Sequence, residues 1–161
     1  MREAGTKVKV YYPMRDTPSF SGNFPQRFRT VEGCLQYIYE MRSADLRCPK
    51  CGRTGSYYFH RHPSKLCYTC NCGRYHFFPL KGTIFAHSFL PLPKWFYGMF
   101  LMSEKPAGTT GKELERQLDV GYATAWRIMH KILSVRPPDA VWKRGRSAAF
   151  NAYIRDAIGA K

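Results

Sequence analysis

Acidic residues are scarce in this sequence. It has 11 Asp and Glu against 26 Lys and Arg in 161 residues, so the formal net charge is +15. Between Leu46 and Ser103 there is no acidic residue, whereas eight Lys and Arg and four of the five His lie there. This balance excludes an acidic or solvating protein. It favours a polyanionic partner, nucleic acid before an anionic membrane surface.

Long apolar runs are also missing. The first ten residues contain no apolar segment of the kind found in signal peptides. The most apolar stretch, Phe89–Met102, has 14 residues and includes Lys94, so it is too short to cross a bilayer. We therefore predict a cytoplasmic protein that does not enter a membrane. In a reducing compartment, its six cysteines indicate metal binding more than disulfides.

The hydrophobic content, 44%, is enough for a folded core. We predict a small α+β protein and a strand at Lys7–Tyr12. Helical spacing over Phe28–Met41 predicts a helix with Thr30 near its start and Cys34 on its buried face. The predicted divisions are a basic N-terminal arm (1–27), a short helix (28–45), a zinc ribbon (46–88), a three-helix unit (89–135) and a basic C-terminal tail (136–161).

Five cysteines are clustered between positions 48 and 72. Structural zinc takes four ligands, commonly as two close pairs brought together by hairpins. Cys48 and Cys51 form the first pair, and β-rich runs follow each group of cysteines, as in a zinc ribbon with one structural Zn²⁺. Cys70 belongs to the second pair in either of two arrangements. Cys67 has the usual two-residue gap, but Cys72 precedes a glycine as Cys51 does, so we prefer Cys72.

Two helices joined by a tight turn are predicted near the C-terminal end. Thr110 is suited to cap the first helix, and Asp119–Gly121 forms the turn before a helix over Tyr122–Ser134. The apolar face of that last helix comprises Ala125, Ile128, Met129 and Ile132. Trp126 is either a core residue, which we prefer, or an aromatic side chain that packs on phosphates. This order is typical of a helix-turn-helix, with an ordinary three-helix bundle as the alternative.

Polar side chains on the last helix and basic side chains elsewhere are the candidate nucleic-acid contacts. On the helix they are Tyr122, Thr124, Arg127, His130 and Lys131. The tail adds Lys143, Arg144 and Arg146, and the ribbon adds Arg53, Arg61 and Arg74. Aromatic residues around Tyr57–Phe59 and Phe77–Phe78 leave two alternatives open, a protein-docking ribbon or a module for single-stranded nucleic acid.

An ordered set of short motifs resembles a known family. The motifs are Phe28–Cys34, Cys48-Pro-Lys-Cys51-Gly52, Gly82-Thr-Ile-Phe85, Pro91-Leu92, Trp95-Phe96-Tyr97, Gly111–Leu114 and Tyr122–Trp126. Together they resemble the N-terminal region of zinc-ribbon insertion-sequence transposases of bacteria, the ISXO-like group, over about residues 28–135. The resemblance implies zinc at Cys48, Cys51, Cys70 and Cys72, and DNA reading by the helix from Tyr122.

The sequence departs from that family after the last predicted helix. In the family, a ribonuclease-H-like domain with acidic catalytic residues follows, whereas here only Asp139 and Asp156 remain before Lys161. Two-metal chemistry needs several carboxylates on a rigid sheet. We therefore predict no catalysis, and expect a duplex DNA-binding accessory subunit of a larger nucleic-acid enzyme or ribonucleoprotein complex. The alternative is the DNA-end-binding part of a split or truncated transposase.

Overall fold

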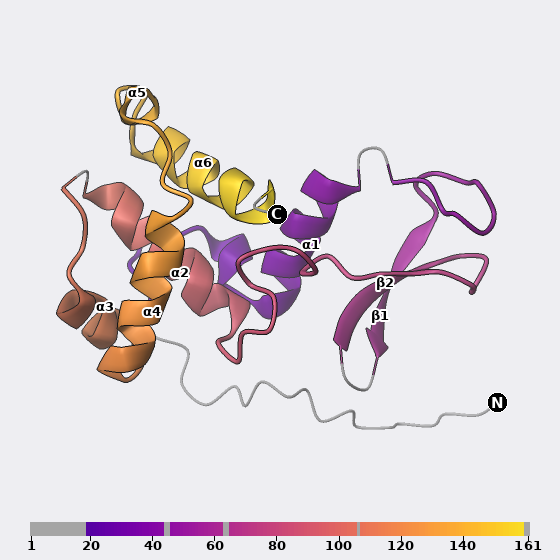
Figure 1. The fold of residues 1–161 in the computed structure, drawn as a ribbon, viewed down its shortest axis with the longest axis horizontal. Coiled ribbons are helices and arrows are strands. Elements are labelled where there is room, and N and C mark those ends of the chain that lie inside the picture. Colours follow the sequence, from indigo (N-terminus) through magenta and orange to yellow (C-terminus); the bar gives the residue numbers. More distant parts are fainter. Residues whose placement is uncertain (1–18, 44–45, 63–64, 106, 160–161) are drawn as a thin grey trace.

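The structure, a computed structural model, describes residues 19–43, 46–62, 65–105 and 107–159, with only the backbone for residues 61, 62 and 65. Its sheet lies at one end and most helices at the other, with α1 between them (Figure 1). The elements, in chain order, are η1 (Gln26–Arg29), α1 (Val31–Arg42), β1 (Tyr57–His62), β2 (Lys65–Cys70), β3 (His76–Phe77), α2 (Leu92–Glu104), α3 (Gly111–Leu118), α4 (Tyr122–Leu133), α5 (Asp139–Trp142) and α6 (Arg146–Gly159).

Helix α2 is the centre of the helical part. It begins after Pro91, and Pro93 lies in its first turn, where a missing backbone N–H does no harm. Its residues are apolar on nearly every side, which is typical of a helix surrounded by others. Helices α1, α3, α4 and α6 all contact it. Within the described part of the chain, no helix is both long and apolar enough to span a membrane.

The N-terminal boundary differs from the prediction. Helix α1 begins as expected, because the hydroxyl of Thr30 accepts a hydrogen bond from the backbone N–H of Gly33. Residues 19–27, however, do not form a free arm, because Phe20 and Phe24 attach them to the core. Phe24 is 1% exposed, and its ring packs against Phe28 and Tyr97. Residues 1–18, with the predicted strand, lie outside the described residues.

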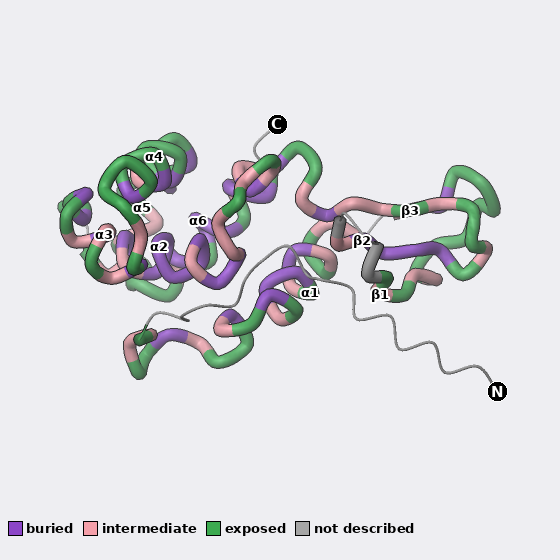
Figure 2. Tube along the Cα trace, turned by 90° about the horizontal axis from the view of Figure 1, so that it is seen from below, coloured by how far each residue is buried: buried purple, intermediate pink, exposed green. Residues whose placement is uncertain are grey.

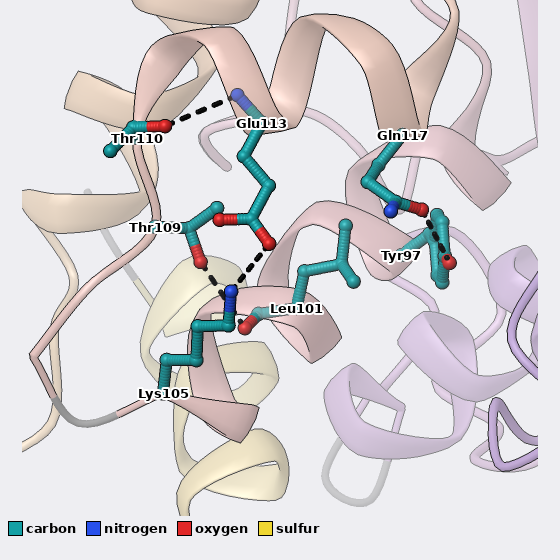
Figure 3. Close-up of polar contacts among 7 residues, drawn as sticks. All are labelled: Tyr97, Leu101, Lys105, Thr109, Thr110, Glu113 and Gln117. Atoms are coloured by element: carbon teal, nitrogen blue, oxygen red, sulfur yellow. Dashed lines mark hydrogen bonds and ion pairs between the residues drawn. The ribbon is translucent and has the colours of Figure 1, made fainter.

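Helices α3 and α4 follow each other across a three-residue turn, as predicted. Thr110 caps α3 by accepting a hydrogen bond from the backbone N–H of Glu113 (Figure 3). Asp119 ends α3 in the left-handed conformation, which asparagine and aspartate tolerate better than most residues. The prediction for Trp126 was wrong, because this side chain is 48% exposed and lies outside the core.

Polar contacts fix α3 to α2 (Figure 3). The ammonium of Lys105 pairs with the carboxylate of Glu113 at 2.5 Å. The hydroxyl of Tyr97 donates to the side-chain oxygen of Gln117 at 3.3 Å and accepts from the backbone N–H of Ser21 at 3.2 Å. Tyr97 therefore joins the N-terminal segment, α2 and α3.

The C-terminal segment is not the tail that we predicted. Residues 139–159 contain α5 and α6, and α6 packs against α2. Most of its buried side chains recur at helical spacing: Ala149, Phe150, Tyr153, Ile154, Ala157 and Ile158, with Ala152 buried between them. The ring of Phe150 lies 5.6 Å from that of Phe100 and 5.8 Å from that of Phe28. Residues from η1 to α6 thus share one hydrophobic core.

The sheet has the antiparallel order β1–β2–β3, with Tyr57 opposite Cys70 and Tyr68 opposite Phe77. One face of it packs on α1, where the rings of Tyr39 and Tyr68 stack at 3.8 Å. Arg42 reinforces this junction by donating to the carbonyl of Lys81 at 2.8 Å. Figure 2 shows buried residues along β2 and exposed ones at the far end of the sheet. The sheet is therefore attached to the helical core through α1.

Gly33 provides a test of how η1 is packed against α1. A Cβ at this position would lie 1.8 Å from the carbonyl oxygen of Arg27, so the backbone of η1 would have to move. We predict that Gly33→Ala destabilises the protein by roughly 1–3 kcal/mol, measured by denaturant unfolding. Gly22→Ala is the matched control, because a Cβ there meets nothing within 4 Å. Equal stability of the two variants would contradict this packing.

Candidate metal centre and nucleic-acid interface

Four cysteines come together at the end of the sheet that is farther from the helices. The Sγ atoms of Cys48, Cys51, Cys70 and Cys72 all lie within 4.8 Å of one another. The Sγ atoms of Cys48 and Cys72 are 3.8 Å apart, and those of Cys51 and Cys70 are 3.6 Å apart. All four are free thiols. The group can therefore hold a single metal ion.

A tight loop positions the first pair of sulfurs. A bridge between Arg47 and Thr54 closes the loop, and the backbone N–H of Cys48 donates to the carbonyl of Arg53 at 2.9 Å. The backbone N–H of Gly52 donates to the carbonyl of Cys48 at 2.8 Å. Gly52 has φ of 72°, a conformation that favours glycine. The glycine after Cys51 thus allows the turn that brings both sulfurs to one side.

The second loop repeats this geometry after β2. The backbone N–H of Cys70 donates to the carbonyl of Tyr75 at 2.9 Å, and the backbone N–H of Gly73 donates to the carbonyl of Cys70 at 2.7 Å. Gly73 has φ of 69°, close to the value at Gly52. We preferred Cys72 because a glycine follows it as one follows Cys51, and the two glycines do form similar turns.

Cys67 lies outside this cluster. It is buried in β2 opposite His60, and its thiol donates to the carbonyl of His60 at 3.6 Å. Cys67 and Cys70 are three residues apart in one strand, so their side chains point to opposite faces of the sheet. The sulfurs of Cys67 and Cys70, the pair with the common two-residue gap, therefore cannot reach the same metal ion. Those of Cys70 and Cys72 lie in one group.

The sulfur spacing fits a tetrahedral metal. With metal–sulfur bonds of about 2.3 Å, the sulfurs of a tetrahedral thiolate site lie about 3.8 Å apart. The two sulfur pairs measured here, at 3.8 and 3.6 Å, agree with this sulfur–sulfur distance. No carboxylate or histidine of the described residues belongs to the group. Four sulfur donors are a set that suits zinc and leaves no position open for water.

The ionisation of the thiols also fits a cation. Burial raises the pKa of Cys48, but the backbone N–H groups of Cys51 and Lys50 and nearby thiols outweigh it and lower the pKa to about 7. The backbone N–H of Cys72 lowers the pKa of Cys70, but burial and the other three sulfurs raise it to about 12. A second thiolate is thus unfavourable beside the first, and a bound cation would remove that repulsion.

A tyrosine hydroxyl is buried near the sulfurs. Tyr57 lies opposite Cys70 in the sheet, and its hydroxyl has no hydrogen-bond partner among the described residues. Burial, together with the charges of Cys48 and Cys70, raises the pKa of Tyr57 to about 12. The phenol therefore remains protonated and available as a donor at the side of the cluster.

Helix α4 places its predicted nucleic-acid contacts on its solvent side. The exposed residues include Tyr122, Thr124, Arg127, His130 and Lys131, whereas Ala125, Ile128 and Ile132 are buried. The ring of Tyr122 also lies over Gly111, where a Cβ would approach it to 3.2 Å. The first turn of α4 is thereby fixed to the start of α3.

The other predicted basic contacts are dispersed. Arg53 and Arg74 are exposed in the loops that carry the cysteines, and the side chain of Arg61 is outside the described part. Lys143 and Arg144 are exposed after α5. Arg146 instead pairs with Glu104 of α2 at 3.1 Å, so it also has a structural contact.

Trp126 belongs to the exposed face, the less favoured of the two positions that the sequence left open. Its indole lies 3.9 Å from the ring of His130, with an interplanar angle of 50°. Tyr122, Trp126 and His130 recur every four residues, and this periodicity, offset from Ala125 and Ile132, was the signal for an outward position.

No known family model matches this chain, and comparisons with curated proteins and with solved structures gave no match either. The cysteine cluster and the exposed face of α4 are therefore the features of the molecule that indicate its function. The similarity to transposases stays a prediction.

The fourth metal ligand can be tested by substitution. We predict that Cys72→Ser loses most of its bound metal, because this sulfur belongs to the four-sulfur group. Cys67→Ser should retain about one metal ion per chain, since the serine hydroxyl can still donate to the carbonyl of His60. Metal content per chain is measured by elemental mass spectrometry. Loss of metal from Cys67→Ser, with Cys72→Ser still loaded, would contradict the assignment.

Proposed function

We propose that this chain is a non-catalytic duplex DNA-binding protein in which α3 and α4 form a helix-turn-helix. The observation that carries the proposal is the exposed side of α4, which is basic and follows a three-residue turn from α3. No acidic residue occurs in α4, whereas Arg127 and Lys131 lie on its exposed side. In a helix-turn-helix the second helix enters the major groove and its N-terminal residues meet the base edges.

The metal of the proposed site is zinc, held by Cys48, Cys51, Cys70 and Cys72. Zinc bound by four thiolates supplies a structural cross-link and no reaction. The chain's own residues position the ribbon, because α1 joins the sheet to the helical core through Tyr39 and Arg42. The exposed Arg53 and Arg74 would then lie in a fixed position for contact with phosphates.

Duplex DNA is favoured over the other partners by the position of the ribbon aromatics. Tyr57, Phe59 and Phe77 pack against the hydrophobic core and are not free on the surface. They therefore offer little to stack on unpaired bases or to dock a protein. Tyr58, at 48% exposed, is an exception on β1.

The biological setting that we propose is an accessory subunit of a larger nucleic-acid enzyme or ribonucleoprotein complex. This setting follows from the resemblance to the DNA-binding region of ISXO-like transposases. A split transposase, with this chain binding the DNA ends, is the alternative within the same class.

We expect no DNA cleavage by the chain. Asp139 pairs with Arg136 at 3.2 Å, and Asp156 with Arg155 at 3.6 Å, so both carboxylates already face cations. Purified protein incubated with supercoiled DNA and Mg²⁺ or Mn²⁺ should leave it intact, as judged by gel electrophoresis. Nicking that disappears in Asp139→Asn or Asp156→Asn would contradict a non-catalytic role.

Binding to duplex DNA is the main test of the proposal. Affinity should fall steeply with salt, since each neutralised phosphate adds about 0.9 to the slope of log K against log salt. Arg127→Ala should weaken binding by about fivefold or more, measured by fluorescence anisotropy. Arg155→Ala is the matched control, because it removes the same charge from an exposed position on α6.

Two results would contradict the proposal. One is a duplex affinity that is unchanged between about 50 and 200 mM salt. The other is an equal loss of affinity in Arg127→Ala and Arg155→Ala, which would mean that net charge, and not the face of α4, determines binding.

A further inference from the structure

The exposed first half of α4 has an unusual set of groups for a helix that reads bases. Side-chain amides read adenine, and carboxylates read cytosine, in the major groove. Helix α4 contains no Asn, Gln, Asp or Glu. Its exposed residues in this half are instead Tyr122, Ala123, Thr124, Trp126 and Arg127. Most of this surface consists of aromatic and methyl groups.

Trp126 is the largest of these groups. Its side chain is 48% exposed and does not belong to the hydrophobic core. The imidazole of His130, one turn further along α4, lies 3.9 Å from the indole and packs against it. A large apolar surface is thus presented outward at the position where a recognition helix meets base edges.

The positive charge of α4 indicates which kind of partner binds over Trp126. Arg127 and Lys131 are exposed on the same helix, with the ammonium of Lys131 over the ring of Trp95, and α4 carries no acidic residue to offset them. A second copy of the chain docked through the same face would bring these cations against their own counterparts. Duplex DNA supplies the opposite charge and also has apolar groups in its major groove. The occupant that fits is therefore DNA.

We propose that α4 recognises thymine through its 5-methyl group, with Trp126 as the main contact and the methyl groups of Ala123 and Thr124 beside it. The thymine methyl is the apolar group that the bases present in the major groove. Because these contacts select thymine, the preferred sites of the protein are rich in A·T pairs. Arg127 is the one side chain in this half of α4 that is suited to guanine. This inference rests on the proposed function, in which α4 enters the major groove.

Replacing thymine by deoxyuridine tests this inference without changing the protein. The metal-loaded full chain first selects its preferred duplexes from a random library. Each thymine of the selected site is then replaced by deoxyuridine, which removes the methyl group and keeps every hydrogen-bonding atom. We expect about a fourfold loss of affinity for each contacted methyl, measured by fluorescence anisotropy.

Two variants locate the contact. Trp126→Ala should bind the thymine duplex more weakly and should no longer distinguish it from the deoxyuridine duplex. It should fold normally, because Trp126 is outside the core, and circular dichroism checks this. Tyr58→Ala removes an aromatic side chain of equal exposure, 48%, from β1. This control should keep the full ratio between the two duplexes.

The outcomes separate this inference from the proposed function. Equal affinity of the wild type for both duplexes would overturn thymine recognition while duplex binding stands. An unchanged ratio in Trp126→Ala would overturn the role of the indole. Failure to bind any duplex would overturn the proposed function and the inference with it. A dimer in solution that Trp126→Ala dissociates would assign this face to a second copy and would also overturn it.

Discussion

The close approach of α4 to α2 at Gly98 is the contact on which the exposed surface of α4 depends. A Cβ on Gly98 would lie 3.2 Å from the side chain of Ile132 and 3.8 Å from that of Ile128. These two isoleucines define the buried side of α4, so the same contact determines which residues face outward. Because the turn after α3 is only three residues long and Tyr122 lies over Gly111, α4 has little freedom to rotate.

The cysteine cluster has a separate role at the opposite end of the molecule. It brings the loop after α1 beside the end of β2, where the backbone N–H of Asn71 also donates to the carbonyl of Ser56, so a bound metal would cross-link these two segments. The sheet then returns to the helices through the stacked rings of Tyr39 and Tyr68. The acid-free span from Leu46 to Ser103 thus covers the whole sheet and continues into α2.

Local signals predicted the parts of the structure that local interactions determine. The cap at Thr110 and the glycine turns beside the cysteines depend on neighbours in the sequence, so they were readable from it. The burial of Phe24 and the packing of α6 were misjudged because both depend on distant rings such as Phe100, and no short sequence pattern identifies those partners. For Trp126 we preferred the core to a phosphate-packing position, whereas the packing of α4 on Gly98 directs this side chain outward.

The most direct test of the central claim is to map the duplex-binding surface by NMR. Amide resonances of the isotope-labelled, metal-loaded chain are followed while a duplex is added. If α4 reads the major groove, the largest shifts will occur over Tyr122–Lys131 and in the turn before it, whereas the exposed positions of α6 will change little. Shifts concentrated in α6 or in the sheet, with α4 unaffected, would contradict the account.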